Sequence, residues 1–190
     1  MADDFVTLVS GLPRSGTSMM MKMLEAGGMP VLVDHVRTAD EDNPEGYYEF
    51  ERVKKIETDA AWLDDAHGRV VKMISALLRH LPPTHRYKVV FMRRTLDEVL
   101  ASQREMLIRR GKSTDATSDE KMAEYFITHL RRVEAWLAEQ PNMDVLYVSY
   151  NDMMRDPRSH CARIAEFLGL PLDPDRMAAV ASGDLYRQRR

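Results

Sequence analysis

The chain has 190 residues, of which 44% are hydrophobic and 30% charged, and its net charge is −3. This length and composition fit one globular domain over residues 1–190, and the small negative charge argues against a nucleic-acid-binding protein, which needs a basic face. The single cysteine, Cys161, excludes an intramolecular disulfide. Because we find neither a signal-peptide pattern nor an apolar run long enough to span a bilayer, we expect a cytoplasmic protein.

The chain begins with the pattern strand, loop, helix. Residues 5–10 form a short apolar run typical of a buried strand, and residues 17–26 predict a helix that ends at Gly27. Residues 31–33 predict a second strand. Residues 49–66 carry apolar side chains at roughly helical spacing and predict a helix.

The second half of the chain repeats this alternation. Three further apolar runs predict strands, at residues 69–72, 87–92 and 144–149. Thr95 and Glu98 form a capping-box pattern that opens one helix, and a long helix carrying Trp136 follows a second such pattern. Asp156, followed by Pro157, is typical of a helix start.

Strands that alternate with helices and read as continuous apolar runs indicate an α/β fold, with a mainly parallel central sheet flanked by helices in three layers. Ligands of such sheets bind at the carboxyl ends of the strands. The segments that follow Ser10, Lys72 and Met92 are therefore the candidate site.

The loop from Gly11 to Ser18 has the spacing of two glycines that is typical of a phosphate-binding loop. Backbone N–H groups in such a loop converge on an anion, and the start of the next helix adds a favourable dipole. A nucleotide triphosphatase has Lys where Thr17 stands. Here the cation is Arg14, inside the loop, and its guanidinium can contact two oxygens at once. The loop therefore predicts a site for a phosphate or sulfate group.

The run Pro13-Arg-Ser-Gly-Thr-Ser18 resembles the first motif of the sulfotransferase superfamily. Members take a sulfuryl group from 3'-phosphoadenosine 5'-phosphosulfate (PAPS) and release the desulfated product PAP. The version with Arg is similar to the bacterial and tyrosylprotein branches. The resemblance implies a P-loop-like fold and a set of residues that bind the 5'-phosphate side of the donor: Pro13, Arg14, Ser15, Gly16, Thr17 and Ser18.

A second match follows the strand predicted at residues 87–92. Arg94 and Ser102 are eight positions apart, which resembles the family motif that binds the 3'-phosphate of the donor. The spacing to Ser102 favours Arg94 over Arg93. Glu98 stands where the family usually has Asp, and the proline of the motif is missing.

A third match covers residues 145–157, which resemble a late strand of the family and the acidic turn after it. Asn151 replaces the usual Glu. We expect Asp152 to order this turn by capping backbone N–H groups. In the basic tail, Arg187 is a candidate for the 3'-phosphate, although a frayed chain end is the simpler interpretation.

The resemblance implies in-line transfer of a sulfuryl group from PAPS to a hydroxyl or amine acceptor, with Arg14 stabilising the leaving oxygen. The base is less well defined. The cytosolic branch has a His two positions after a Lys, but the residues after Lys72 lack it. Glu49 is our first candidate, in a run similar to bacterial members; His35 is its rival, and Asp34 also stays open. We expect no metal, because no cluster has convincing ligand spacing.

Two other readings stay open. A P-loop kinase or other nucleotide-binding protein would share the glycine spacing but needs the Lys that Thr17 replaces. A catalytically inactive domain that binds PAPS or PAP would keep the motifs without turnover. The sequence identifies neither the acceptor nor the oligomeric state.

Overall fold

In the computed structural model, residues 5–34, 48–111 and 118–181 are described. A four-stranded parallel sheet lies at the centre, with strand order β2-β1-β3-β4. Its strands are β1 (Val6–Gly11), β2 (Val70–Lys72), β3 (Tyr87–Arg93) and β4 (Met143–Ser149). The predicted α/β fold with a parallel sheet is confirmed.

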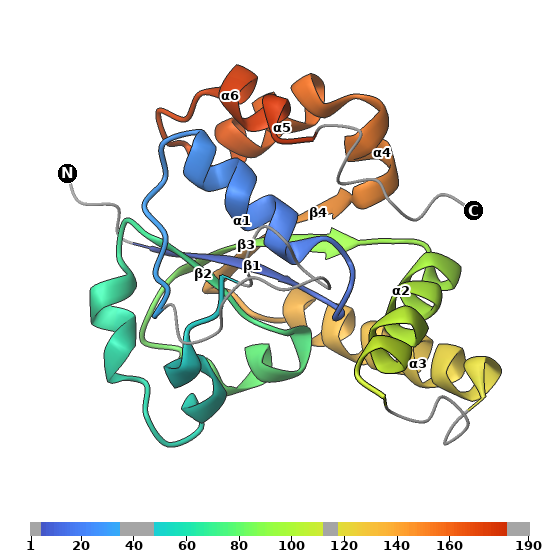
Figure 1. Ribbon diagram of the computed structural model, residues 1–190. Helices are drawn as coiled ribbons and strands as arrows, with labels where there is room; N and C mark the ends of the chain where they lie inside the picture. Colours follow the sequence, from blue (N-terminus) through green and yellow to red (C-terminus); the bar gives the residue numbers. More distant parts are fainter. Residues whose placement is uncertain (1–4, 35–47, 112–117, 182–190) are drawn as a thin grey trace.

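Helices cover both faces of the sheet, so the molecule has three layers (Figure 1). On one side lie α1 (Thr17–Ala26), α4 (Tyr150–Arg155), α5 (Pro157–Leu168) and α6 (Pro174–Ala179). On the other lie α2 (Leu96–Arg109), α3 (Asp119–Ala138) and the 3₁₀-helices η1 (Glu51–Lys55), η2 (Ala61–Ala66) and η3 (Ser75–His80). Within the described residues, no helix combines the length and apolar character needed to cross a membrane.

The core divides into two layers because side chains alternate across each strand. Val9 and Val90 face one side, where they pack with α1, α5 and α6. Leu8 and Val89 face the other, where they pack with η2 and with the end of α3. Cys161 lies buried in the first layer, and burial raises the pKa of its thiol to about 12, so the thiol stays protonated near neutral pH.

Two predictions of secondary structure are wrong. The helix predicted over residues 49–66 is two short 3₁₀-helices, because the carboxylate of Asp59 interrupts the chain between them. That carboxylate accepts hydrogen bonds from the backbone of Ala61 (3.2 Å) and from both Nε and Nη2 of Arg52 (3.0 Å each). The strand predicted at residues 31–33 is only an isolated bridge between Val31 and Val70.

The predicted helix start at Asp156 is confirmed. Its carboxylate accepts a hydrogen bond from the backbone of Ser159 (3.3 Å), and Pro157 is the first residue of α5. The helix ends at Gly169, whose φ of 70° is left-handed. Its buried residues Cys161, Ile164 and Leu168 belong to the same core layer as the buried side of α1.

Candidate functional site

The loop between β1 and α1 is held in an unusual conformation by its own residues. Arg14 has a φ of 68°, and Gly16 has a φ of 94°. The buried hydroxyl of Ser15 donates a hydrogen bond to the carbonyl of Leu12 (2.7 Å), and the backbone N–H of Ser15 donates to the same oxygen (3.2 Å). Ser15 therefore shapes the loop, while Pro13 is exposed on it.

Gly16 is required at its position by space as well as by conformation. A Cβ atom there would lie 2.5 Å from Cδ2 of Tyr150, at the start of α4. Tyr150 is buried, and the guanidinium carbon of Arg94 lies 4.4 Å from the centre of its ring. The tyrosine is thus packed between the loop and Arg94. The sequence motifs assign no role to Tyr150, although its place directly after β4 puts it at the carboxyl edge of the sheet.

The structure brings the first two predicted motifs into direct contact. Nε of Arg14 donates a hydrogen bond to the hydroxyl of Ser102 on α2 (2.8 Å). Nη1 of Arg94, at the end of β3, donates to the carbonyl of Arg14 (3.2 Å). Two guanidinium groups therefore converge from different elements on one edge of the sheet, where they can stabilise anionic groups.

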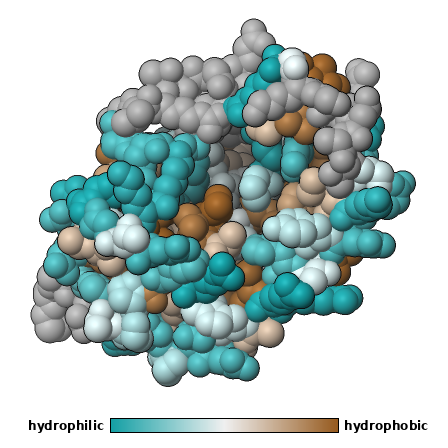
Figure 2. All heavy atoms as spheres, turned by 90° about the horizontal axis from the view of Figure 1, so that it is seen from below, coloured by the Kyte–Doolittle hydropathy of each residue, from teal (hydrophilic) through white to brown (hydrophobic). Residues whose placement is uncertain are grey.

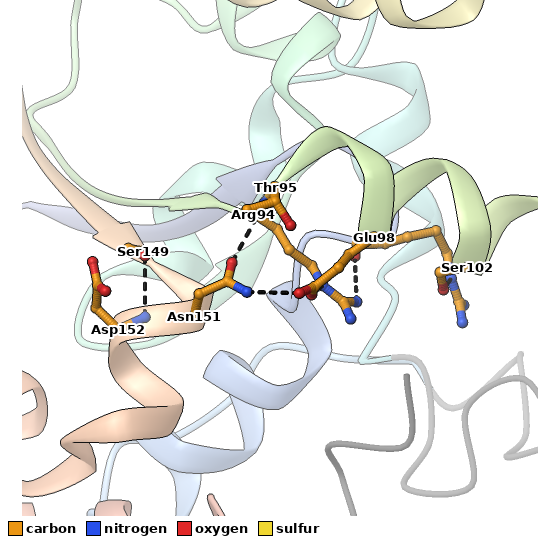
Figure 3. A network of polar contacts seen from close by, with 8 residues as sticks. Arg94, Thr95, Glu98, Ser102, Ser149, Asn151 and Asp152 are labelled. Carbon is orange, nitrogen blue, oxygen red and sulfur yellow. Dashed lines mark hydrogen bonds and ion pairs between the residues drawn. The ribbon is translucent and has the colours of Figure 1, made fainter. Parts of the chain in front are cut away.

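A polar network holds Arg94 in place (Figure 3). Nε of Arg94 donates to Oε2 of Glu98 (2.7 Å), and Nδ2 of Asn151 donates to Oε1 of the same carboxylate (2.8 Å). The side-chain oxygen of Asn151 in turn accepts from the backbone of Thr95 (3.4 Å). The side chain of Arg94 is only 9% exposed, so its direction is set by these contacts rather than by solvent.

This network overturns two predicted helix caps. The side chain of Thr95 makes no capping hydrogen bond, and the carboxylate of Glu98 binds Arg94 and Asn151 instead of reaching back to the start of α2. In the turn after β4, the cap is the hydroxyl of Ser149, which accepts from the backbone of Asp152 (3.2 Å). The carboxylate of Asp152 pairs with Arg155 instead (3.1 Å).

The third predicted segment of the site, after β2, also reaches the loop. Nζ of Lys72 donates a hydrogen bond to the hydroxyl of Ser18 in the first turn of α1 (3.2 Å). Thr17 is the first residue of that helix and is half-buried. The start of α1 and three cations from separate strands and loops therefore lie along one edge, which is an electrostatic environment for anions.

The candidate bases are only partly described. Glu49 is half-buried; its Oε2 lies 3.7 Å from Nζ of Lys54, and its carbonyl accepts from the backbone of Asp34 (3.3 Å). The carboxylate of Asp34 accepts from the backbone of Glu51 (2.5 Å), so it orders the entry to η1. His35 and Arg187 lie outside the described residues. Within the described part of the chain, no three His, Cys, Asp or Glu side chains gather as metal ligands would.

The fold defines an α/β protein of the P-loop type, in which Arg14 and Arg94 meet at the loop between β1 and α1. The family model described as "Sulfotransferase domain" matches residues 4–183. The chain therefore belongs to the sulfotransferase family. None of the curated proteins matches this sequence.

Solved structures with the same fold are also sulfotransferases. The domain from the olefin synthase of Synechococcus PCC 7002 is 17% identical, with a TM-score of 0.55 over 99% of this chain and 84% of that chain. STF1 from Mycobacterium tuberculosis H37Rv is 16% identical, with a TM-score of 0.57 over 96% and 72%. Mouse SULT7A1, complexed with PAP, is 17% identical, with a TM-score of 0.61 over 100% and 67%. At such identities the likeness shows a shared fold.

The contact between Gly16 and Tyr150 gives a prediction on stability. We expect Gly16→Ala to lower the free energy of unfolding more than Gly28→Ala. Both glycines have positive φ, 94° and 103°, but a Cβ at Gly28 would meet nothing within 4 Å. Backbone strain alone costs about 1–3 kcal/mol, and the overpacking against Tyr150 adds about 1–3 kcal/mol. Urea denaturation of both variants measures the difference; equal losses would show that the ring of Tyr150 does not restrict the loop.

Proposed function

We propose that this sulfotransferase uses PAPS as its donor and moves the sulfuryl group to a hydroxyl or amine acceptor by in-line transfer. The observation that carries the proposal is the hydrogen bond from Arg14 to Ser102, together with Arg94 on the carbonyl of Arg14. PAPS carries two separate anionic ends, and these residues come from the two motifs that would each hold one end. The complex of mouse SULT7A1 with PAP supports this choice of donor.

The residues present fit a donor of this kind. On the 5' side, the half-buried Thr17 and Ser18 offer hydroxyl donors at the start of α1, and Gly16 allows the backbone to approach an anion closely. On the 3' side, the hydroxyl of Ser102 accepts from Arg14 and so keeps its own hydrogen to donate to an anion. Arg94, held by Glu98, supplies the charge.

In the proposed transfer, the acceptor oxygen or nitrogen forms a bond to sulfur while the bond from sulfur to the bridging oxygen breaks. The electron pair of that bond leaves on the 5'-phosphate of PAP, and the proton of the acceptor passes to a base. Arg14 lies within the loop and stabilises the negative charge that develops on the leaving oxygen. Lys72, on the hydroxyl of Ser18, adds a second positive charge beside the loop.

For the base we propose Glu49, with His35 as the alternative. Glu49 follows the first helix in the chain, its half-buried carboxylate lies 3.7 Å from Nζ of Lys54, and a positioned carboxylate is a common general base. The direct test of the whole proposal is transfer of radiolabelled sulfate from PAPS to a pool of acceptors. Binding of PAP without transfer to any acceptor would support an inactive PAP-binding domain instead.

The two neighbouring arginines allow a matched test of donor binding. We expect Arg94→Gln to weaken PAP binding about 10- to 100-fold, because a charged hydrogen bond contributes about 1.5–3 kcal/mol. Arg93→Gln should bind PAP normally, since Arg93 pairs with Glu134 away from the loop (2.7 Å). Isothermal titration with PAP and with ATP-Mg measures both, and circular dichroism checks folding.

The outcome of that titration also separates the classes of protein. Tight binding of ATP-Mg by the unaltered chain without binding of PAP would overturn the proposal in favour of a P-loop kinase. Arg94→Lys keeps the charge but loses the planar fork of donors. We therefore expect an intermediate affinity for PAP, whereas a purely structural role for Arg94 predicts the same affinity once the variant is folded.

The proposed base has a matched control in the chain itself. We expect Glu49→Gln to lower kcat about 100- to 10,000-fold, the usual contribution of a general base, with PAP affinity unchanged. Glu51→Gln is the control, because Glu51 pairs with the same lysine, Lys54 (2.6 Å). Steady-state rates with an acceptor that receives the sulfuryl group measure the effect. Full activity of Glu49→Gln would exclude Glu49 as the base. The same measurement would then be made on His35→Asn.

A further inference from the structure

A second pocket lies between η3 and α3, on the layer of the molecule opposite to α1. Its volume is about 390 Å³, within the range of small-molecule sites. Figure 2, seen from below, shows the face of the molecule turned away from α1 as mainly hydrophilic, with hydrophobic residues exposed in a hollow near its middle. One of the residues that line the pocket is Ser75, three residues after Lys72. The lining includes none of the residues that we propose to bind the donor.

A serine and a histidine form the polar floor of this pocket. The hydroxyl of Ser75, only 2% exposed, and Nε2 of His129 are 2.8 Å apart and hydrogen-bonded. Burial lowers the pKa of His129, and the charge of Arg79 lowers it further. The imidazole is therefore uncharged at neutral pH, and the positive charge of the pocket comes from its arginines.

Two arginines line the pocket from opposite elements, Arg79 on η3 and Arg132 on α3. Among the described residues that line it, none is acidic. Arg79 donates to His80 (3.0 Å), whereas Arg132 has no hydrogen-bond or ion-pair partner among the described residues. Two guanidinium groups beside one pocket without a carboxylate make a site that an anion would complete.

Two aromatic side chains, Tyr125 and Trp136, also line the pocket. The ring of Tyr125 stacks on His129, with centroids 6.3 Å apart and planes 12° from parallel. Trp136 follows His129 by two turns of α3 and also lines the pocket. These rings offer flat apolar surface next to the guanidinium groups, which is the combination that holds a planar molecule with one anionic end.

We propose that this pocket is a second binding site, separate from the donor site, for a small carboxylate that carries an aromatic ring. The guanidinium groups of Arg79 and Arg132 bind the carboxylate, the Ser75–His129 pair supplies a further hydrogen bond, and Trp136 packs against the ring. The inference rests on the lining of the pocket and does not depend on the donor or on the transfer reaction.

Fluorescence of the full chain tests the site directly. The chain has two tryptophans, and Trp62 is fully buried in the core, so a ligand in the pocket contacts only Trp136. We expect benzoate to change the emission of Trp136 saturably. Benzamide, which has the same shape without the charge, should bind at least about 10-fold more weakly, because hydrogen bonds to a charged group are stronger. No saturable change with benzoate up to its solubility limit, or equal binding of benzamide, would overturn the inference.

Adjacent arginines on α3 provide the matched control. Arg132→Gln should weaken benzoate binding about 10-fold, whereas Arg131→Gln, next to it but outside the pocket, should leave binding unchanged. Arg79→Gln is a second loss variant, from η3. PAP binding should stay unchanged in all three variants. Benzoate binding that is equal in Arg132→Gln, Arg79→Gln and the unaltered chain would reject the site, whatever the outcome with PAP.

Discussion

The hydrogen bond from Arg14 to Ser102 joins two parts of the chain that are 88 residues apart, and the arrangement of the proposed donor site depends on it. It ties the loop after β1 to the helix after β3, while Arg94 binds the carbonyl of Arg14 from the same side. Both arginines are thereby held close together, and Glu98 pairs with Arg94 (2.7 Å). Guanidinium groups so close together favour a ligand that brings more than one anionic group.

The sheet makes this contact possible. Since all four strands are parallel, their carboxyl ends meet at one edge. Lys72 ends β2 there, and the segments after β1, β3 and β4 bring Arg14, Arg94 and Tyr150 to the same edge. Tyr150 acts as a packed spacer. Its ring sets the distance between the loop at Gly16 and the guanidinium of Arg94, and the Glu98–Asn151 pair fixes the direction of that guanidinium.

The two proposed ligand sites differ in how they use charge. At the carboxyl edge, the arginines are held by hydrogen bonds to a carbonyl, a hydroxyl and one carboxylate, so the site is largely organised before a ligand binds. In the pocket between η3 and α3, Arg79 donates to His80 and Ser75 pairs with His129, but Arg132 has no partner among the described residues. A ligand in the pocket therefore has to order the side chain of Arg132. The entropy lost in this ordering lowers the affinity of the pocket for the ligand.

The α/β fold with its parallel sheet could be predicted from the sequence, because apolar runs are local properties of the chain. Motif spacing also pointed to Arg94 and Ser102, but the partner of Ser102 in the structure is Arg14. The sequence pattern misassigned residues 49–66, since apolar spacing does not register the side chain of Asp59 competing for backbone N–H groups. The capping pattern at Thr95 is wrong for a similar reason. The carboxylate of Glu98 binds Asn151 on α4, which is 53 residues away in the sequence and therefore invisible to a local pattern. Only the tertiary structure decided the place of Tyr150 and the pocket around His129, because both depend on which segments pack together after the chain has folded.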